Sequence, residues 1–283
     1  MLSGSYGDWV GRTEEARDFS ALTAVDRFNA TMNLHVPPCA PGDPVPLMAH
    51  WLFFTPTALH DQLGEDGHPR RGGFLPPVHD LPRRMFAGAR YRFLAPLPAG
   101  REIARKSTIL SVKEKDGASG RLVFVTVRHE IAEVGGPVAI EEEHDIVYRG
   151  LNGAAAKAAP AAPEGADWSR NLTPDAVLLF RYSAITFNAH RIHYDLPYAQ
   201  NEEGYPGLVV QGPLIAKLML RLAQDNLAGR EITGFSFRAV SPLFGGREMS
   251  VHGVEPDANG VAKVWACNDQ GGLAMQGEVT VAS

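Results

Sequence analysis

An internal repeat constrains the fold of this 283-residue chain more than any other feature. The segment 96–102, Pro-Leu-Pro-Ala-Gly-Arg-Glu, recurs at 242–248 as Pro-Leu-Phe-Gly-Gly-Arg-Glu, with five identities in seven positions. An aromatic residue followed by arginine, at 91–92 and at 237–238, matches at the same offset of 146 residues. Self-similarity over such a distance indicates a duplicated structural unit. We therefore expect two related domains rather than one large one.

Short strand-like segments separated by turn residues follow each copy of the repeat. Asp-Gly at 116–117 and Asn-Gly at 259–260 are typical of tight β-hairpins, and each half turns again at a Gly-Gly pair. Each half is thus expected to end in an antiparallel meander of three or four strands. The expected segments are 107–113, 122–127, 138–140 and 145–148 in the first half, and 249–254, 261–266, 273–275 and 279–281 in the second.

The second half also contains one long apolar helix. Pro213 precedes the segment 214–224, whose apolar residues cover most of a helical circumference. Such a helix must be enclosed, which favours a curved antiparallel sheet wrapped around it. In the first half we compare it with 75–86, where three prolines predict a shortened or lost helix. An earlier aromatic-rich segment, 47–54, is consistent with either a helix or a strand.

The two halves are joined by a segment of low complexity. Residues 151–168 are rich in alanine, contain two prolines and show no amphipathic period. We therefore predict a first domain over 1–150, a linker over 151–168 and a second domain over 169–283.

Composition excludes several classes of function. The net charge is −5 and the pI about 6.1, and basic residues cluster only as dipeptides, which argues against nucleic-acid binding. The amino-terminal residues resemble no secretion signal, and no stretch of 18 apolar residues predicts a membrane span. Cys39 and Cys267 lie outside any metal-binding spacing, which leaves only a single disulfide open. We expect a cytoplasmic protein without a cofactor.

The segment 181–195 has the densest set of reactive polar side chains. His190 and His193 are ordinary core histidines in the simplest interpretation. As residues three apart on a helix they are also a conceivable metal pair, but no third ligand is indicated, so no metal is predicted. Ser183 lacks the Gly-x-Ser-x-Gly pattern of a nucleophilic serine.

A resemblance to a known family favours a catalytic interpretation. The run Tyr-Ser-Ala-Ile-Thr-Phe-Asn-Ala-His-Arg-Ile-His-Tyr-Asp at 182–195, with Tyr-Pro-Gly-Leu-Val-Val-Gln-Gly-Pro-Leu at 205–214, resembles the hydratase motif of the MaoC-like dehydratases. It is most similar to the branch of mesaconyl-C4-CoA hydratase, itaconyl-CoA hydratase and the type 2 3-hydroxyacyl-thioester dehydratases. The resemblance extends into the first half through 42–44, 50–51 and 81–88.

The resemblance implies an α+β, double hot-dog fold of two tandem hot-dog domains. Each would have an antiparallel sheet, the second wrapping the long helix. The domain 1–150 would be degenerate, with a structural and substrate-binding role, and the domain 169–283 would be catalytic. The sheets of the two halves could pair within one chain as a pseudo-dimeric monomer, and a homodimer of such chains is also expected.

The family motif reads approximately Gly-Asp-x-Asn-Pro-x-His-x-Asp, with its first Asp and its His as the catalytic pair. His193 takes the place of this His and Asp195 that of the trailing acid. Asn188 stands where the family has its catalytic Asp, and His190 where it has Asn. Because an amide cannot accept the proton, a mechanism with two titrating partners cannot be copied directly.

The resemblance implies a hydro-lyase that adds water to, or removes it from, the α,β double bond of a short enoyl-CoA. In this hypothesis His193 is the base, Asn188 holds the water, and Gly212 offers a backbone N–H to the developing enolate oxygen. His190 would lie behind these residues and help to position them.

The substrate implied is a dicarboxylic C5 acyl-CoA such as mesaconyl-C4-CoA or itaconyl-CoA. Arginines Arg191, Arg84 and Arg90 are candidates to bind its second carboxylate, and Asp195 is included among the substrate-binding residues. Three alternatives remain open: a fatty-acid-type 3-hydroxyacyl-thioester dehydratase, an acyl-CoA thioesterase and a non-catalytic acyl-thioester-binding module.

Overall fold

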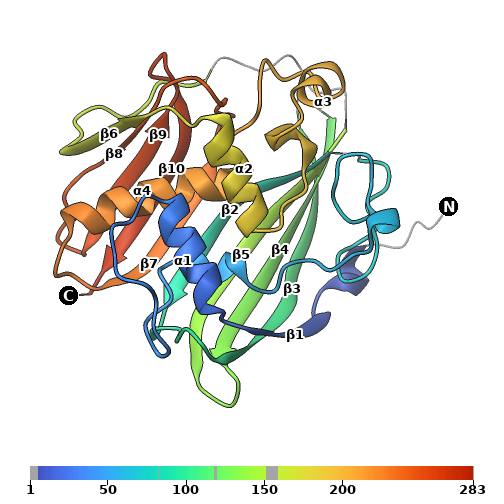
Figure 1. Cartoon of the computed structure of the whole chain (residues 1–283). Helices are drawn as coiled ribbons and strands as arrows, with labels where there is room; N and C mark the ends of the chain where they lie inside the picture. Colours follow the sequence, from blue (N-terminus) through green and yellow to red (C-terminus); the bar gives the residue numbers. More distant parts are fainter. Residues whose placement is uncertain (1–5, 82, 118–119, 151–158, 283) are drawn as a thin grey trace.

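The fold is described from a computed structural model, which covers residues 6–81, 83–117, 120–150 and 159–282. Within these residues the strands form one large antiparallel sheet (Figure 1). Its order is β1 (Thr13–Phe19), β3 (Glu102–Gly117), β4 (Gly120–Glu133), β5 (Val138–Arg149), β2 (Arg83–Phe93), β7 (Ile232–Ala239), β10 (Leu273–Val281), β9 (Val261–Cys267), β8 (Met249–Gly253) and β6 (Trp168–Leu172).

The sheet consists of two five-stranded halves joined by pairing of β2 with β7. The meanders β3–β4–β5 and β8–β9–β10 confirm the antiparallel meander expected after each copy of the repeat. The last two segments expected in each half form one continuous strand, β5 or β10. Gly100 and Gly246, 146 residues apart, have φ angles of 72° and 77°. Glycine is required at both turns, since this region is strained for other residues. The expected linker lies partly outside the described residues, at 151–158, and β6 begins at Trp168.

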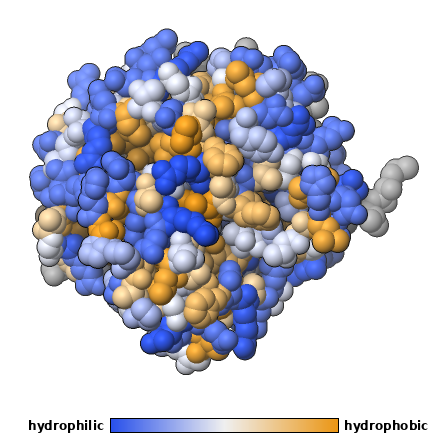
Figure 2. Space-filling view, in the orientation of Figure 1, coloured by the Kyte–Doolittle hydropathy of each residue, from blue (hydrophilic) through white to orange (hydrophobic). Residues whose placement is uncertain are grey.

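The helices lie together on one face of the sheet, as Figure 1 shows. They are α1 (Leu22–Thr31), α2 (Ala176–Ile185), the short α3 (Leu196–Asn201) and α4 (Gly212–Asn226). The long helix predicted over 214–224 is confirmed as α4, and eight of its side chains are buried against the sheet and its neighbours. In Figure 2, apolar side chains gather over the middle of this face, with hydrophilic side chains among them.

The first half retains only one turn of the corresponding helix. The N–H of Val45 donates to the carbonyl of Leu97, and that of Val210 to the carbonyl of Leu243, 146 residues later than Leu97. Residues after Val45 therefore correspond to those entering α4. They form the short 3-10 helix η2 (Ala49–Leu52). As expected, 75–81 and 83–86 contain no helix, but the comparison with that region was wrong, because the counterpart of α4 lies within 47–54.

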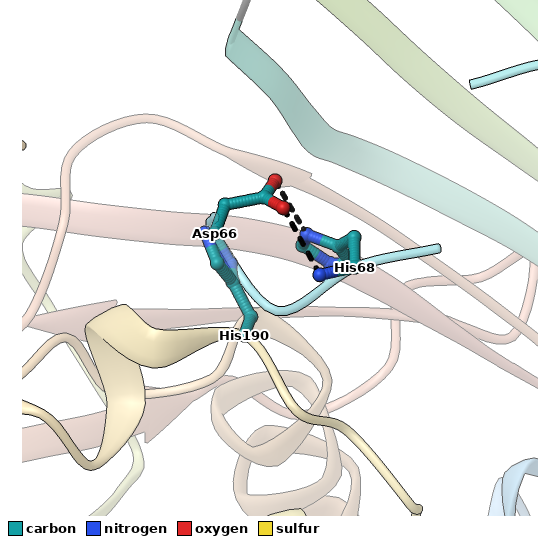
Figure 3. Close-up of side chains that lie close together, drawn as sticks. All are labelled: Asp66, His68 and His190. Atoms are coloured by element: carbon teal, nitrogen blue, oxygen red, sulfur yellow. Dashed lines mark hydrogen bonds and ion pairs between the residues drawn. The ribbon is translucent and has the colours of Figure 1, made fainter. Parts of the chain in front are cut away.

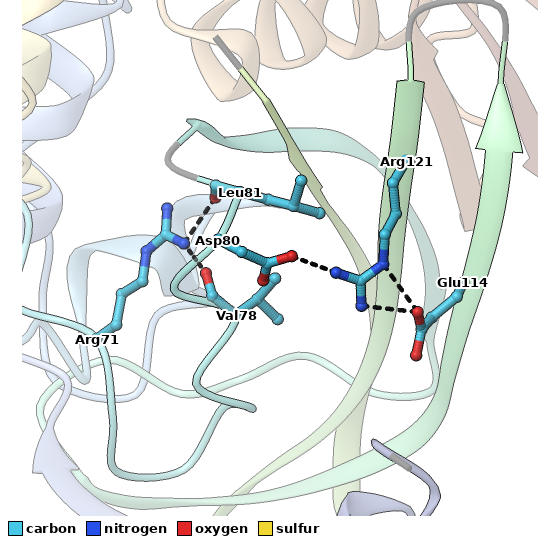
Figure 4. A network of polar contacts seen from close by, with 6 residues as sticks. All are labelled: Arg71, Val78, Asp80, Leu81, Glu114 and Arg121. Atoms are coloured by element: carbon cyan, nitrogen blue, oxygen red, sulfur yellow. Dashed lines mark hydrogen bonds and ion pairs between the residues drawn. The ribbon is translucent and has the colours of Figure 1, made fainter. Parts of the chain in front are cut away.

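Residues 53–81 cover the sheet where the first half lacks its long helix. Val78 and Leu81 are buried against strand residues that include Ile109, Val125 and Tyr148. Polar contacts fix the end of this segment (Figure 4). In these, Arg71 donates to the carbonyls of Val78 and Leu81, and Arg121 bridges Asp80 to Glu114. The end of the segment is therefore anchored on β3 and β4 of the first half.

Lys217 is an unusual element of the α4 interface, because it is a fully buried amine. Its Nζ donates to the carbonyl of Leu47 at 2.9 Å and to Oε1 of Gln224 at 3.3 Å. Burial lowers its pKa from 10.5 to about 7, and the nearby charge of Arg221 adds to this. The folded protein therefore disfavours the charged amine that the unfolded chain carries at neutral pH.

Lys217→Met is expected to stabilise the protein by about 1–3 kcal/mol at pH 7, because it removes the cost of burying this amine. Between pH 7 and 10.5 the unfolded chain binds more protons, so wild-type stability should rise with pH, and the variant should lose this rise. Urea unfolding at several pH values measures both effects. The exposed Lys263→Met serves as control and should change stability by less than about 0.5 kcal/mol. A destabilised Lys217→Met protein would contradict the prediction.

Candidate active site

His193 lies at the end of the 3-10 helix η4 (Arg191–His193) and is 7% exposed. Its Nδ1 lies 2.7 Å from the carbonyl oxygen of Val209, so Nδ1 carries the proton and donates it. Nε2 is then left unprotonated. Burial lowers the pKa of His193 to about 4. The ring is therefore a neutral imidazole with a fixed tautomer, as a general base requires.

The residues that orient His193 lead directly into α4. Val209 binds the His193 segment through both its N–H and its carbonyl, and two residues later Gln211 occupies the N-cap position of α4. The Gln211 amide donates to the carbonyl of Leu179 and to Oγ of Ser183, both on α2. Gly212 is the first residue of α4, and a Cβ there would approach the ring of Phe86 at 3.3 Å. The His193 ring and the amino-terminal end of α4 are thus built as one unit.

Asn188 follows the end of α2, in a turn that two backbone hydrogen bonds hold in place. The N–H of Asn188 donates to the carbonyl of Ser183, and that of Phe187 to the carbonyl of Ala184, which together form a Schellman motif. Phe187 occupies its left-handed position with φ of 49°, where the family motif has Gly. Oδ1 of Asn188 accepts from the backbone N–H of His190. The side-chain amide N–H2 of Asn188 is therefore the group that it can offer a ligand.

His190 contacts two further histidines, and one of them comes from the first half. Its ring centroid lies 5.4 Å from that of His193 and 4.2 Å from that of His68. His68 in turn contacts Asp66, with Nδ1 to Oδ2 at 3.0 Å (Figure 3). Burial lowers the pKa of His190 to about 2, and the charges of the neighbouring histidines add to this. Sequence reasoning missed Asp66 and His68, which lie more than 100 positions before His190.

Arg191 and Asp195 are engaged with each other. Nη2 and Nε of Arg191 lie 2.7 and 2.9 Å from Oδ2 of Asp195, while Oδ1 of Asp195 accepts from the N–H of Tyr198 and so caps α3. The Arg191 guanidinium also stacks over the Tyr198 ring at 4.1 Å and donates to the carbonyl of Glu65. Both residues thus hold the loops beside His193 in place. Their contact with substrate stays a prediction.

The two arginines of β2 lie on opposite faces of the sheet. They are six positions apart, which in a regular strand gives the same face, but a β-bulge interrupts β2 between Phe86 and Gly88. Arg84 lies on the helix-bearing face, hydrogen-bonds Tyr148 and is one of the charges acting on His190. Arg90 pairs with Glu143 and Asp145 on the outer face. The structure therefore does not place Arg90 at the site, contrary to its expected role.

Asp66, His68 and His190 are the described residues that come closest to a metal-binding group, since one ligand atom from each lies within 4.8 Å of the others. The surrounding charge disfavours a cation. Arg84 acts on His190, and Arg71 interacts electrostatically with Asp66. The group has a single carboxylate, which is already hydrogen-bonded to His68.

Comparison with known proteins gives the class of fold first. The solved structure of HtdX from Mycobacterium tuberculosis superposes with a TM-score of 0.66 at 16% identity, covering 96% of this chain and all of that chain. A further M. tuberculosis protein, described as having a double hotdog fold, gives a TM-score of 0.60 at 11% identity and covers 96% of both chains. The expected double hot-dog fold is thereby confirmed.

Sequence comparison then gives the family. The chain belongs to the hydroxyacyl-thioester dehydratase type 2 family, whose model matches residues 48–245. Mesaconyl-C(4)-CoA hydratase of Chloroflexus aurantiacus is 48% identical over 248 residues, covering 86% of this chain and 87% of that protein. The mitochondrial hydroxyacyl-thioester dehydratase type 2 of Schizosaccharomyces pombe is 27% identical over 259 residues, covering 81% and 85%. In the part of the chain that the structure describes, no helix is long and apolar enough to cross a membrane.

Proposed function

We propose that this protein is a hydro-lyase that adds water reversibly to the α,β double bond of a short enoyl-CoA. One observation carries the proposal. His193, at the position of the family's catalytic histidine, is buried, neutral and held by the Val209 carbonyl so that Nε2 can accept a proton. The 48% identity with a mesaconyl-C(4)-CoA hydratase supports the same reaction class.

In the direction of hydration, Nε2 of His193 takes a proton from water while the water oxygen bonds to the β carbon. The amide N–H2 of Asn188 would hold this water, because its Oδ1 is occupied by the N–H of His190. The π electrons move to the thioester, whose oxygen becomes negative. In the reverse direction His193 returns its proton to the leaving hydroxyl.

The developing negative charge can be stabilised at the beginning of α4. The N–H groups of the first turn of a 15-residue helix have no partners within the helix and point out of its end. The Gly212 backbone N–H is the proposed donor, and the absence of a side chain there lets the thioester oxygen approach closely. Phe86, whose ring lies 3.3 Å from the position of a Cβ on Gly212, would line the acyl site.

A dicarboxylic C5 acyl-CoA is the proposed substrate, with Arg84 binding its second carboxylate. Arg84 shares the face of the sheet that carries Phe86 and lies within electrostatic range of His190. Arg191 is already paired with Asp195, and Arg90 lies on the outer face. Among the three candidate arginines, the position of Arg84 thus fits this role best.

Arg84→Gln is expected to raise KM for a dicarboxylic enoyl-CoA about 10- to 100-fold and to change KM for crotonyl-CoA less than about threefold, because only the first substrate has a second carboxylate. Steady-state kinetics with both substrates measures the effect. Arg90→Gln, the same change on the outer face, is the matched control and should leave both KM values near wild type. An equal increase in KM for both substrates would mean that Arg84 supports the fold and does not bind the second carboxylate.

The reaction itself is tested by the absorbance of the conjugated enoyl thioester, which falls on hydration. A panel of C4 and C5 enoyl-CoAs should include at least one that is hydrated. A thiol-trapping dye in the same assay should detect no release of CoA. Release of CoA would indicate a thioesterase, and binding without turnover across the panel would indicate a non-catalytic binding module; either would overturn the proposal.

In this proposal, the domain 169–283 is catalytic, and the domain 1–150 has a structural and substrate-binding role. Pairing of β2 with β7 joins the two halves within one chain. A homodimer of such chains and a cytoplasmic location remain predictions from the sequence.

A further inference from the structure

The loop 64–68 of the first half is docked onto the catalytic segment of the second. The backbone N–H of Arg191 donates to the carbonyl of Asp66 at 2.9 Å, and its guanidinium donates to the carbonyl of Glu65 at 3.0 Å. Gly67, with φ of 87°, lies so close to Ala189 that a Cβ would stand 1.9 Å from its carbonyl oxygen. Such close contact fixes the loop relative to His190 and His193.

The docked loop carries an imidazole oriented by a carboxylate. Asp66 accepts from His68 twice, from the backbone N–H at 3.0 Å and from Nδ1 at 3.0 Å. Although burial opposes it, the hydrogen bond and charge of His68 lower the pKa of Asp66 to about 2. A carboxylate on Nδ1 fixes the orientation of the ring and directs Nε2 away from the carboxylate. The His68 side chain keeps 23% of its surface exposed, so a ligand can reach it.

A second proton-transfer group would complement His193 in this reaction. Hydration places one proton on the α carbon in addition to the proton that His193 removes from water. The family motif has a carboxylic acid at position 188, whereas this chain has Asn188, which cannot transfer a proton. His190 remains neutral because burial and its neighbours lower its pKa to about 2.

We propose that His68, held by Asp66, is the second acid–base residue of the active site and replaces the carboxylate missing at position 188. This inference rests on the proposed function. As the water oxygen bonds to the β carbon and His193 takes the water proton, the Nε2 proton of His68 passes to the α carbon. His193 then releases its proton to solvent and His68 regains one, so that the net change is the addition of water alone.

The first test is the pair of variants His68→Gln and Asp66→Asn, assayed with a substrate that the wild type hydrates. His68→Gln is expected to lower kcat about 100-fold with little change in KM, and Asp66→Asn about 10-fold, because the second variant only loosens the ring. The matched controls are His60→Gln and Glu65→Gln, which make the same changes at exposed positions nearby and should stay within about twofold. Thermal unfolding establishes that all four variants are folded.

The second test distinguishes proton transfer from a structural role. If His68 transfers a proton in the reaction, the dependence of kcat/KM on pH should differ between the wild type and His68→Gln. Imidazole added to His68→Gly should restore part of kcat. Three titratable groups act directly on His68: Asp66 on its own loop, and His190 and His193 from the second half. Around these, Tyr198 and Arg71 act on Asp66, and Arg84 acts on His190. Wild-type kcat in His68→Gln, or an unchanged pH profile without rescue, would overturn the inference.

Two further outcomes are decisive. Loss of activity in a chelator and its return with Zn²⁺ would make Asp66, His68 and His190 a metal centre, and the inference would be wrong. An inactive wild-type protein, or an active His193→Ala, would refute the proposed function itself. Normal activity of His68→Gln, together with an inactive His193→Ala, would refute only the role of His68.

Discussion

His193→Ala is expected to lower kcat for hydration about 10³- to 10⁴-fold while the protein stays folded. The variant removes the group that accepts the proton from water, and general acid–base catalysis typically contributes 10²–10⁴ in rate. It also removes a buried ring whose Nδ1 binds the Val209 carbonyl, so a modest loss of stability accompanies it. Initial rates of the fall in enoyl absorbance give kcat, and circular dichroism shows whether the variant is folded. His35→Ala replaces an exposed histidine and should have the kcat of the wild type.

The pH dependence of the wild type provides an independent check on the same residue. Burial lowers the pKa of His193 from 6.5 to about 4, so the ring is a competent base at all pH values above about 5. Activity that depends on neutral His193 should therefore fall only as the pH drops through about 4. An acid limb of kcat/KM near 6.5 that belongs to His193 would contradict the geometry described here.

Much of the fold follows from local features of the sequence. Turn residues and alternating strands predict the two meanders, and the nearly all-apolar segment 214–224 predicts the enclosed helix α4. The counterpart of α4 in the first half lies within 47–54 and not within 75–86, because local sequence leaves 47–54 consistent with either a helix or a strand. Its correspondence becomes visible only through the hydrogen bonds of Val45 and Val210 to the repeated Pro-Leu segment.

Part of the site can likewise be predicted from residues that are close in sequence, and part depends on the fold. Residues 188–195 lie close in sequence, and their spacing already indicates a catalytic segment. Asp66 and His68 reach it only because the first half replaces a helix with the long segment 53–81, and no spacing within the chain records that path. Arg84 and Arg90 look equivalent in the sequence. One bulge in β2, which depends on strand pairing, places them on opposite faces.

The buried carboxylate of Glu142 is the polar centre of the first half. On β5 it accepts hydrogen bonds from Nε1 of Trp51 and the hydroxyl of Tyr91, each at 3.1 Å, and its Oε2 lies 3.2 Å from Nε2 of His50. Burial raises its pKa, but the contact with His50 outweighs this and lowers it to about 2. Glu142 therefore ties η2, the shortened counterpart of α4, to β2 and β5.

Glu142→Ala is expected to lower the free energy of unfolding by about 3–5 kcal/mol, because it leaves several buried polar groups without their shared partner. The matched control Glu143→Ala removes a partly exposed carboxylate of β5 that pairs with Arg90 of β2, and should cost less than about 1 kcal/mol. Urea unfolding compares the two. The pKa of Glu142 is lowered from 4.5 to about 2, so its contribution is complete above pH 4.5 and is lost as the pH falls toward 2. The Glu142→Ala protein should lack this acid-side loss. Equal losses in the two alanine variants would mean that the carboxylate does not hold η2 against the sheet.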